Sequence, residues 1–327
     1  MSLNPNRSIS RLAIAADVKA SRRSDSTARS RTQKISVKKS IQLGTNGDNG
    51  IEKIDFEFEC ARDGTAAPTE TQRIEFEDDV CREIIHLQEW AADLDWIKIP
   101  VPELKIIVSD RYSISKSLVP AWSGRRGCME FPTWRVASRK AAVMHELVHV
   151  FFPNGNRFLA EGLAVHLQDS IGGNPAFPNF GKPLHRNVCE RLLEMTPRNS
   201  GEDPLGLGQI HLAKLDLIPT PNPLTLRVGA ELYGEDQRGQ AFVYPIAGSF
   251  VQFLLETFGV ERFRSLYTQT QLLPLVLNAG SSDRWSDVYC MTLADLENEW
   301  KSMVVREFSV ANCETFEETK VAAAQPK

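Results

Sequence analysis

The spacing of apolar residues predicts a sheet in the first part of the chain. From Ile51 to Glu59, in IEKIDFEFE, apolar residues alternate with charged ones, as in a strand with one buried face. Short apolar runs at Leu104–Ser109 and Cys128–Phe131 indicate two more strands. Glu77–Leu94 carries apolar residues at helical spacing instead. We expect a small mixed sheet that is accompanied by one helix.

Helical spacing dominates from about residue 137 onwards. The expected helices are Ala137–Phe152, Phe158–Asp169, His185–Met195, Ala241–Phe258, Val260–Tyr267 and Leu293–Phe308. Strands followed by helices are typical of an α+β fold, here with a mostly helical C-terminal part. The pattern indicates one domain at 49–310, made of a strand and helix at 51–100 and a core at 101–310, with a short tail at 311–327.

Positive charge is concentrated ahead of this domain. The first forty residues contain ten Lys and Arg against two Asp, whereas the rest of the chain carries 28 basic and 40 acidic residues. The turn-forming run Gly44–Gly50, GTNGDNG, closes this segment, so we expect residues 1–48 to form a disordered basic tail. Solvated tails and organelle transit peptides share its composition, and both interpretations stay open.

Charge and hydropathy exclude several classes of protein. A nucleic-acid-binding core gathers Lys and Arg on its folded surface, but this domain is acidic. No stretch reaches the roughly 20 apolar residues of a membrane span, and Leu12–Ala16 is too short for the core of a secretory signal. Six cysteines without a CxxC pair are expected to be reduced thiols, although their number permits three bridges. These features favour a cytoplasmic location.

One segment carries distinctive chemistry. His145-Glu146-Leu147-Val148-His149 is an HExxH motif within an expected apolar helix. Residues four apart share a helix face, so both imidazoles can bind one zinc ion, while Glu146 lies about 100° round the helix and reaches a water on that ion. Polar side chains among apolar neighbours are costly without partners. The alternative is a chance occurrence of the motif.

Glu161 completes a candidate set of zinc ligands. It lies twelve residues after His149, in the next expected helix, FLAEGLAVHLQ. If the chain reverses near Gly155, within the turn-forming run Pro153–Asn156, the helical rise brings Glu161 level with His149. Two His and one Glu leave a fourth position for water, as in catalytic zinc sites. A solvated surface carboxylate is the alternative, which the apolar neighbours of Glu161 disfavour.

These segments resemble the gluzincin metallopeptidases, in particular the peptidase MA-like domains related to the thermolysin and M1 aminopeptidase groups. HELVHVFF and LAEGLAVHL are similar to the HExxH helix and the glutamate-ligand helix of that family, and LADLENEWKSMV is similar to its closing helix. The resemblance covers roughly residues 104–305. It implies a zincin-like fold and a zinc-dependent peptidase that acts on a peptide or protein substrate, with Glu146 as general base.

The same resemblance implies further site residues. Tyr244, in YPIAGSFVQFLLETFGVERFRSLY, would donate a hydrogen bond to the oxyanion of the tetrahedral intermediate. A tyrosine that only packs at a helix start is the alternative. The strand Cys128–Phe131 would be the edge along which substrate binds. Glu130, in GCMEF, is then either an ordinary strand-edge acid or a ligand for a substrate amine.

Two features qualify the resemblance. Val165 stands where thermolysin-type members carry an Asp that holds a zinc histidine, so another group must take that role. His166 is rotated off the face of Glu161 and is expected to point away from the metal. The alternative function is a zinc-binding interaction module of the same fold without catalysis. Retention of Glu146 argues against it, because the three ligands suffice to bind zinc.

Overall fold

The computed structural model describes residues 34–43, 52–61, 67–94, 96, 103–118, 126–195, 205–220, 237–273 and 276–323. Over these residues the chain forms a five-stranded mixed sheet, and helices dominate after the last strand. Strands therefore come first and helices afterwards, in agreement with the expected α+β arrangement. Cys60, Cys81, Cys128, Cys189 and Cys290 are free thiols.

The sheet has the strand order β1-β2-β3-β5-β4. Its strands are β1 Lys34–Leu43, β2 Glu52–Ala61, β3 Glu103–Val108, β4 Lys116–Leu118 and β5 Arg126–Phe131. The central pairs β2–β3 and β3–β5 are parallel, and the outer pairs β1–β2 and β4–β5 are antiparallel. The three strands predicted from alternation or apolar runs are β2, β3 and β5, which supply the buried side chains Ile54, Leu104, Ile106 and Met129.

Strand β1 corrects the expectation of a basic tail over residues 1–48. Residues 34–43 pair along their whole length with β2, with Val37 opposite Phe58. Val37 packs against the core, and the Ser40 hydroxyl donates to Asp55 Oδ1 at 2.5 Å. The run KISVKKSIQL has apolar residues at alternating positions, but Lys and Ser between them give it the composition of a tail. Residues 1–33 lie outside the described residues.

The helices occupy most of the chain from residue 133 onwards. They are α1 Glu70–Asp93, α3 Thr133–Ala137, α4 Val143–Phe151, α5 Arg157–Ser170, α6 Leu184–Met195, α7 Leu212–Leu215, α8 Gln237–Phe258, α9 Val260–Thr268, α10 Arg284–Tyr289 and α11 Leu293–Ala323, with a 3₁₀ turn at Leu207–Gln209. Of these described helices, none is both long enough and apolar enough to span a bilayer.

Several helix boundaries differ from the predictions, including the start of α8, which lies four residues before the expected Ala241. Helix α1 begins seven residues earlier than expected, because Thr69 and Gln72 form a capping box there. The helix expected to begin at Ala137 begins at Val143 instead: Ala137 ends the short helix α3, and Arg139 between the two helices adopts a left-handed φ of 55°. Helix α11 continues to Ala323, so most of the expected tail at 311–327 is helical. The Glu, Lys and Ala residues of this stretch have high helix propensity, so they favour a helix even though no apolar face marks one in the sequence.

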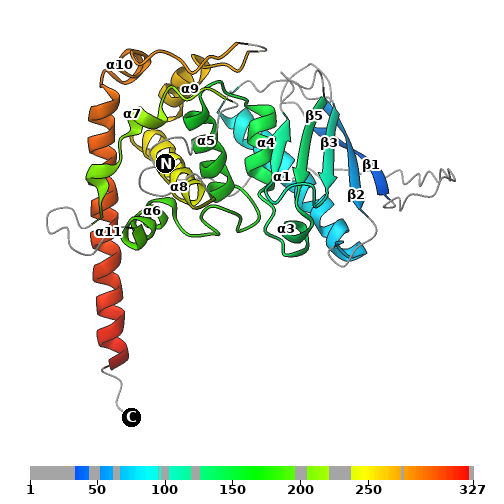
Figure 1. The fold of residues 1–327 in the computed structure, drawn as a ribbon, viewed down its shortest axis with the longest axis horizontal. Coiled ribbons are helices and arrows are strands. Elements are labelled where there is room, and N and C mark those ends of the chain that lie inside the picture. Colours follow the sequence, from blue (N-terminus) through cyan, green and yellow to red (C-terminus); the bar gives the residue numbers. More distant parts are fainter. Residues whose placement is uncertain are drawn as a thin grey trace.

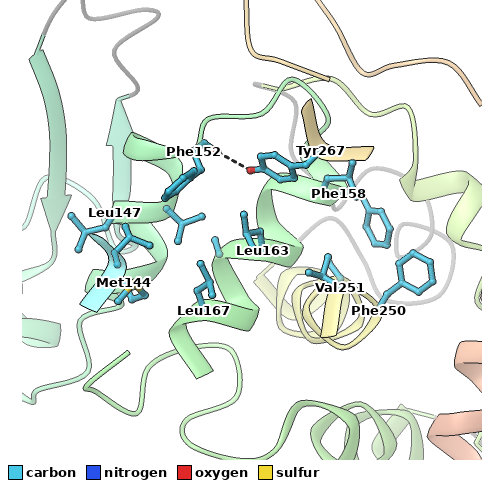
Figure 2. Packing of buried hydrophobic residues seen from close by; sticks show 14 of the residues in the cluster. Met144, Leu147, Phe152, Phe158, Leu163, Leu167, Phe250, Val251 and Tyr267 are labelled. Carbon is cyan, nitrogen blue, oxygen red and sulfur yellow. Dashed lines mark hydrogen bonds between the residues drawn. The ribbon is translucent and has the colours of Figure 1, made fainter. Parts of the chain in front are cut away.

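The elements are stacked in sequence from the sheet outwards (Figure 1). Helix α4 lies next to the sheet, α5 lies beside α4, and α8 lies beside α5, while α6 and the long α11 cover the far side. Figure 2 shows the buried side chains that join the three central helices: Met144 and Leu147 from α4, Leu163 and Leu167 from α5, and Phe250 and Val251 from α8. The Tyr267 hydroxyl closes this core by donating to the Phe152 carbonyl at 2.7 Å.

Two glycines allow α5 and α8 to approach closely. A Cβ added at Gly162 would lie 2.7 Å from the Ala247 carbonyl oxygen, and a Cβ added at Gly248 would lie 2.9 Å from the Cβ of Val165. Each helix therefore presents a glycine to the other at the crossing point. Since Gly162 directly follows Glu161, this contact sets the distance between the candidate zinc ligand and α8.

Candidate metal centre

Helix α4 begins without a capping side chain of its own, because its N-cap residue is Ala142. Two side chains from other helices accept hydrogen bonds from its first turn instead. Gln168 on α5 accepts from the backbone N–H of His145 at 3.1 Å, and buried Glu83 on α1 accepts from that of Met144. A helix start leaves such N–H groups without partners, so these bonds fix the position of the HExxH segment.

The turn between α4 and α5 is held by two buried asparagines. Asn156 caps α5, since its Oδ1 accepts from the Leu159 N–H at 3.0 Å. Asn154 accepts from the Asn156 N–H at 2.8 Å and donates to the Tyr267 carbonyl at 2.8 Å. The chain reverses here, as the spacing from His149 predicted, and α5 returns alongside α4.

His145, His149 and Glu161 meet between these two helices, and all three are buried. Nε2 of His145 lies 3.1 Å from Nε2 of His149, and Oε2 of Glu161 lies 3.0 and 3.3 Å from these two nitrogens. The imidazole rings are inclined at 85°, so they approach a common point from different directions. The structure thus brings together the three residues expected to bind the metal.

The spacing of the three atoms fits a zinc ion. Ligand atoms about 2.0–2.1 Å from a tetrahedral ion stand about 3.3–3.4 Å apart, which is close to the separations of 3.0–3.3 Å found here. Within the described part of the chain, the buried Oε2 of Glu161 has no hydrogen-bond partner. A cation would satisfy this oxygen and both nitrogens together.

Arg157 orients Glu161. It lies one turn earlier on α5 and forms an ion pair with Oε1 of Glu161, which leaves Oε2 to face the histidines. Burial by itself would raise the pKa of Glu161, but Arg157 and His149 outweigh it and hold this pKa well below its usual range. Glu161 is therefore ionised, as a ligand must be. Arg157 thus holds Glu161 and not a zinc histidine, and Nδ1 of buried His145 has no hydrogen-bond partner among the described residues.

Tyr244 lies within α8 and not just before its start. Its ring centroid is 6.3 Å from that of His145, and its side chain is hydrogen-bonded to that of Arg157. Burial raises the pKa of Tyr244 above its usual value, so the phenol keeps its proton and can donate a hydrogen bond. Buried Glu146 lines the same cleft as Tyr244.

This cleft has a volume of about 960 Å³ and gives access to the three candidate ligands. Its lining includes residues 113–118, which contain β4. The expectation that Cys128–Phe131 is the sheet edge is wrong, because β5 pairs with β3 on one side and β4 on the other. Within the described sheet β4 is the edge strand on the side of β5, and β1 is the opposite edge. The three residues of β4, KSL, are too few for a pattern of alternation to reveal.

The remaining predicted residues have other surroundings. Glu130 lines the cleft from inside the sheet and accepts a hydrogen bond from the Ser109 hydroxyl. His166 lies outside the ligand cluster, as its position on the helix predicted, and burial lowers its pKa to about 4. Sequence reasoning missed Arg157 and Arg135, which also line the cleft. The position of Arg157 four residues before Glu161 was an available signal, whereas Arg135 comes close only through the fold.

No family model, curated protein or solved structure matches this chain. The chemistry of the site therefore has to be inferred from its residues. Two imidazoles and a carboxylate converge in a cleft, and two further carboxylates, two phenols and three guanidinium groups line the same cleft. Such a set can bind a divalent cation, transfer a proton and stabilise negative charge.

Proposed function

We propose that this protein is a zinc-dependent peptidase with a zincin-like fold of the gluzincin type. The observation that carries the proposal is the convergence of His145, His149 and Glu161 on one point, with their ligand atoms within 4.8 Å of one another. Glu146, which zinc binding alone does not need, lines the same cleft. Zinc held there would activate a water molecule and polarise the carbonyl of the scissile peptide bond.

Glu146 acts as the general base. It follows His145 directly on α4, so its carboxylate lies beside the ligand set and not within it. It accepts a proton from the attacking water and passes it to the nitrogen of the leaving amine. The low exposure of Glu146, 5%, keeps bulk water from competing for this proton.

Tyr244 stabilises the oxygen that becomes negative during attack. Its hydroxyl keeps its proton because burial opposes ionisation, so it donates a hydrogen bond to the developing oxyanion. Arg157 holds both the Tyr244 hydroxyl and the Glu161 carboxylate. The donor and one zinc ligand are thereby fixed relative to each other by a single guanidinium group.

The substrate binds as an extended segment against β4. Strand β4 pairs with β5 along one edge, through Lys116 opposite Glu130 and Leu118 opposite Cys128. Its other edge belongs to the segment that lines the cleft. An exposed edge offers backbone N–H and C=O groups to an additional strand, which would present a peptide bond to Glu146.

The test is cleavage of an unbiased peptide mixture, analysed by mass spectrometry. The zinc-loaded protein should cleave peptides, and Glu146→Gln should bind zinc without cleaving them. A metal-chelating phenanthroline should stop cleavage, and its non-chelating isomer should not. Zinc binding by both proteins, without cleavage by either, would instead establish the zinc-binding interaction module. Absence of zinc binding would reject both functions.

A further inference from the structure

The cleft contains more positive charge than the proposed reaction uses. Four cations line it, namely Arg111, Lys116, Arg135 and Arg157, against three carboxylates, namely Glu130, Glu146 and Glu161. Two of the carboxylates have partners within the protein, since Glu161 pairs with Arg157 and Glu130 accepts from a serine hydroxyl. A bound divalent ion would add two positive charges. The cleft is therefore suited to an anionic group on the substrate.

Arg135 differs from Arg157 in having no ion-pair partner among the described residues, and from Arg111 and Lys116 in being half-buried. It lies on the short helix α3, and no carboxylate oxygen of the described residues is within 4.0 Å of its guanidinium group. Its Nε is buried without a hydrogen-bond partner. A buried donor left unsatisfied is costly, and an arginine remains charged under all ordinary conditions. This side chain is thus available to a ligand.

Aromatic contacts connect Arg135 with the candidate metal centre. Its guanidinium carbon lies 5.2 Å from the Trp134 ring and 6.0 Å from the Phe177 ring. These rings stabilise the cation without using its N–H donors. The Phe177 ring in turn lies 6.0 Å from the Tyr244 ring, and Arg135, Tyr244 and Glu146 line the same cleft. Because Glu146 must face the scissile bond, an anion held by Arg135 belongs to a residue next to that bond.

Arg111 and Lys116 do not have these properties. Both are exposed, and both stack on the ring of Tyr112, with the Lys116 Nζ at 3.8 Å and the Arg111 guanidinium carbon at 5.0 Å. Their charge can attract an anionic peptide to the cleft. Arg135, which is half-buried, can bind the carboxylate of such a peptide through a pair of hydrogen bonds and so distinguish it from a neutral peptide.

We propose that Arg135 is a specificity-determining residue that binds a substrate carboxylate next to the scissile bond, so that the preferred substrates are acidic peptides. This inference rests on the proposed peptidase function. The carboxylate has two sources, an Asp or Glu side chain beside the cleaved bond or a free C-terminus one residue beyond it. The guanidinium group of Arg135 would bind either carboxylate through two parallel N–H···O hydrogen bonds.

The experiment compares peptides that differ in one group. The peptide cleaved best from a mixture is made with Glu, Gln or Lys on each side of the scissile bond, and with a free or an amidated C-terminus. The full-length zinc-loaded protein should cleave one carboxylate form roughly 10- to 100-fold better than its amide, measured as kcat/KM. The position of that carboxylate distinguishes the two sources.

Variants assign the preference to Arg135. In Arg135→Gln the kcat/KM of the carboxylate peptide should be close to that of the amide peptide. Arg135→Glu should cleave the Lys peptide best. Arg186→Gln, at an exposed position of α6 outside the cleft, is the matched control and should keep the wild-type ratio of kcat/KM. Cleavage without a carboxylate preference, or a preference that survives Arg135→Gln, overturns the inference and leaves the peptidase function standing.

A binding measurement decides the inference even if no peptide is cleaved. The same peptides are titrated into zinc-loaded Glu146→Gln by calorimetry. The carboxylate form should bind roughly 10- to 100-fold more tightly than the amide form, and Arg135→Gln added to this variant should remove the difference. Equal affinity for the carboxylate and amide peptides contradicts the role of Arg135, whatever the outcome for catalysis.

Discussion

The backbone N–H of His145 donates a hydrogen bond to Oε1 of Gln168, 23 positions further along the chain, at 3.1 Å. The Gln168 amide in turn donates to the Asn174 carbonyl at 3.0 Å. On the other side of the same helix start, Glu83 accepts from Met144 and from Gly173. The first turn of the HExxH helix is therefore supported by α1 and by α5 together.

This support predicts a pH dependence of stability. Burial raises the pKa of Glu83 from 4.5 to about 7, with Asp79 adding to the increase and the two backbone N–H donors and Arg82 opposing it. Below pH 4.5 the carboxyl is protonated in both the folded and the unfolded chain. Between pH 4.5 and 7 the unfolded chain ionises first, so the free energy of unfolding falls, by about 3 kcal/mol in all.

The free energy of unfolding of Glu83→Gln should not fall between pH 4.5 and 7. We expect urea unfolding at a series of pH values to show that wild type loses stability between pH 4.5 and 7 relative to the variant. Glu89→Gln, an exposed position on the same helix, is the control and should follow wild type. Parallel pH profiles for wild type and Glu83→Gln would show that Glu83 does not titrate in this range.

Gly162→Ala should destabilise the protein and disturb the site. The new Cβ would lie 2.7 Å from the Ala247 carbonyl oxygen, so α5 and α8 must separate, at a cost of about 1–3 kcal/mol. Thermal unfolding measures this cost. Gly173→Ala, whose Cβ meets nothing closer than 3.4 Å, is the control and should have a smaller effect. Equal effects of the two substitutions would contradict a tight contact between the helices.

Tyr244→Phe should slow turnover with little change in KM. A hydroxyl that donates to the oxyanion acts on charge present in the transition state, and loss of one such donor typically costs about 10²-fold in kcat. Tyr289→Phe is the matched control, because Tyr289 is buried outside the cleft and its hydroxyl has no partner within the described residues. Steady-state kinetics in which both variants resemble wild type would remove Tyr244 from the mechanism.

Removal of β1 should destabilise the sheet. A chain that starts at residue 46 loses a strand paired along its whole length with β2, and exposes the apolar positions of β2 that include Phe58. We expect a lower thermal midpoint and aggregation through the new edge. A chain that starts at residue 32 keeps β1 and is the reference. Identical midpoints for the two chains would show that β1 contributes nothing to stability.

Much of the fold was predictable because burial leaves a periodic pattern. The alternating residues of β2 and the helical spacing of α5 and α6 identified these elements to within one or two residues. Strand β1 was missed because Lys39 interrupts the alternation of Ile35, Val37 and Ile41 in a basic stretch. The start of α4 was predicted at Ala137, six residues too early, because it depends on tertiary contacts of the first turn that no local pattern encodes.

The candidate site was predictable where its residues lie close in sequence. Helical geometry places His145 and His149 on one face, and a short turn brings Glu161 level with them. The edge strand β4 and Arg135 could not be predicted, since both reach the cleft only through the assembled sheet and α3. Glu83 and Gln168 were missed for the same reason, because they cap a helix from two other elements.

The most direct test of the account is the zinc content of the purified full-length protein, measured by mass spectrometry of the elements. The ligand atoms of His145, His149 and Glu161 predict one zinc per chain, retained after dialysis against metal-free buffer. Glu146→Gln should keep this ion, and His149→Ala should lose it. A protein that contains no zinc and takes up none when dialysed against it would contradict the metal centre and the peptidase function proposed from it.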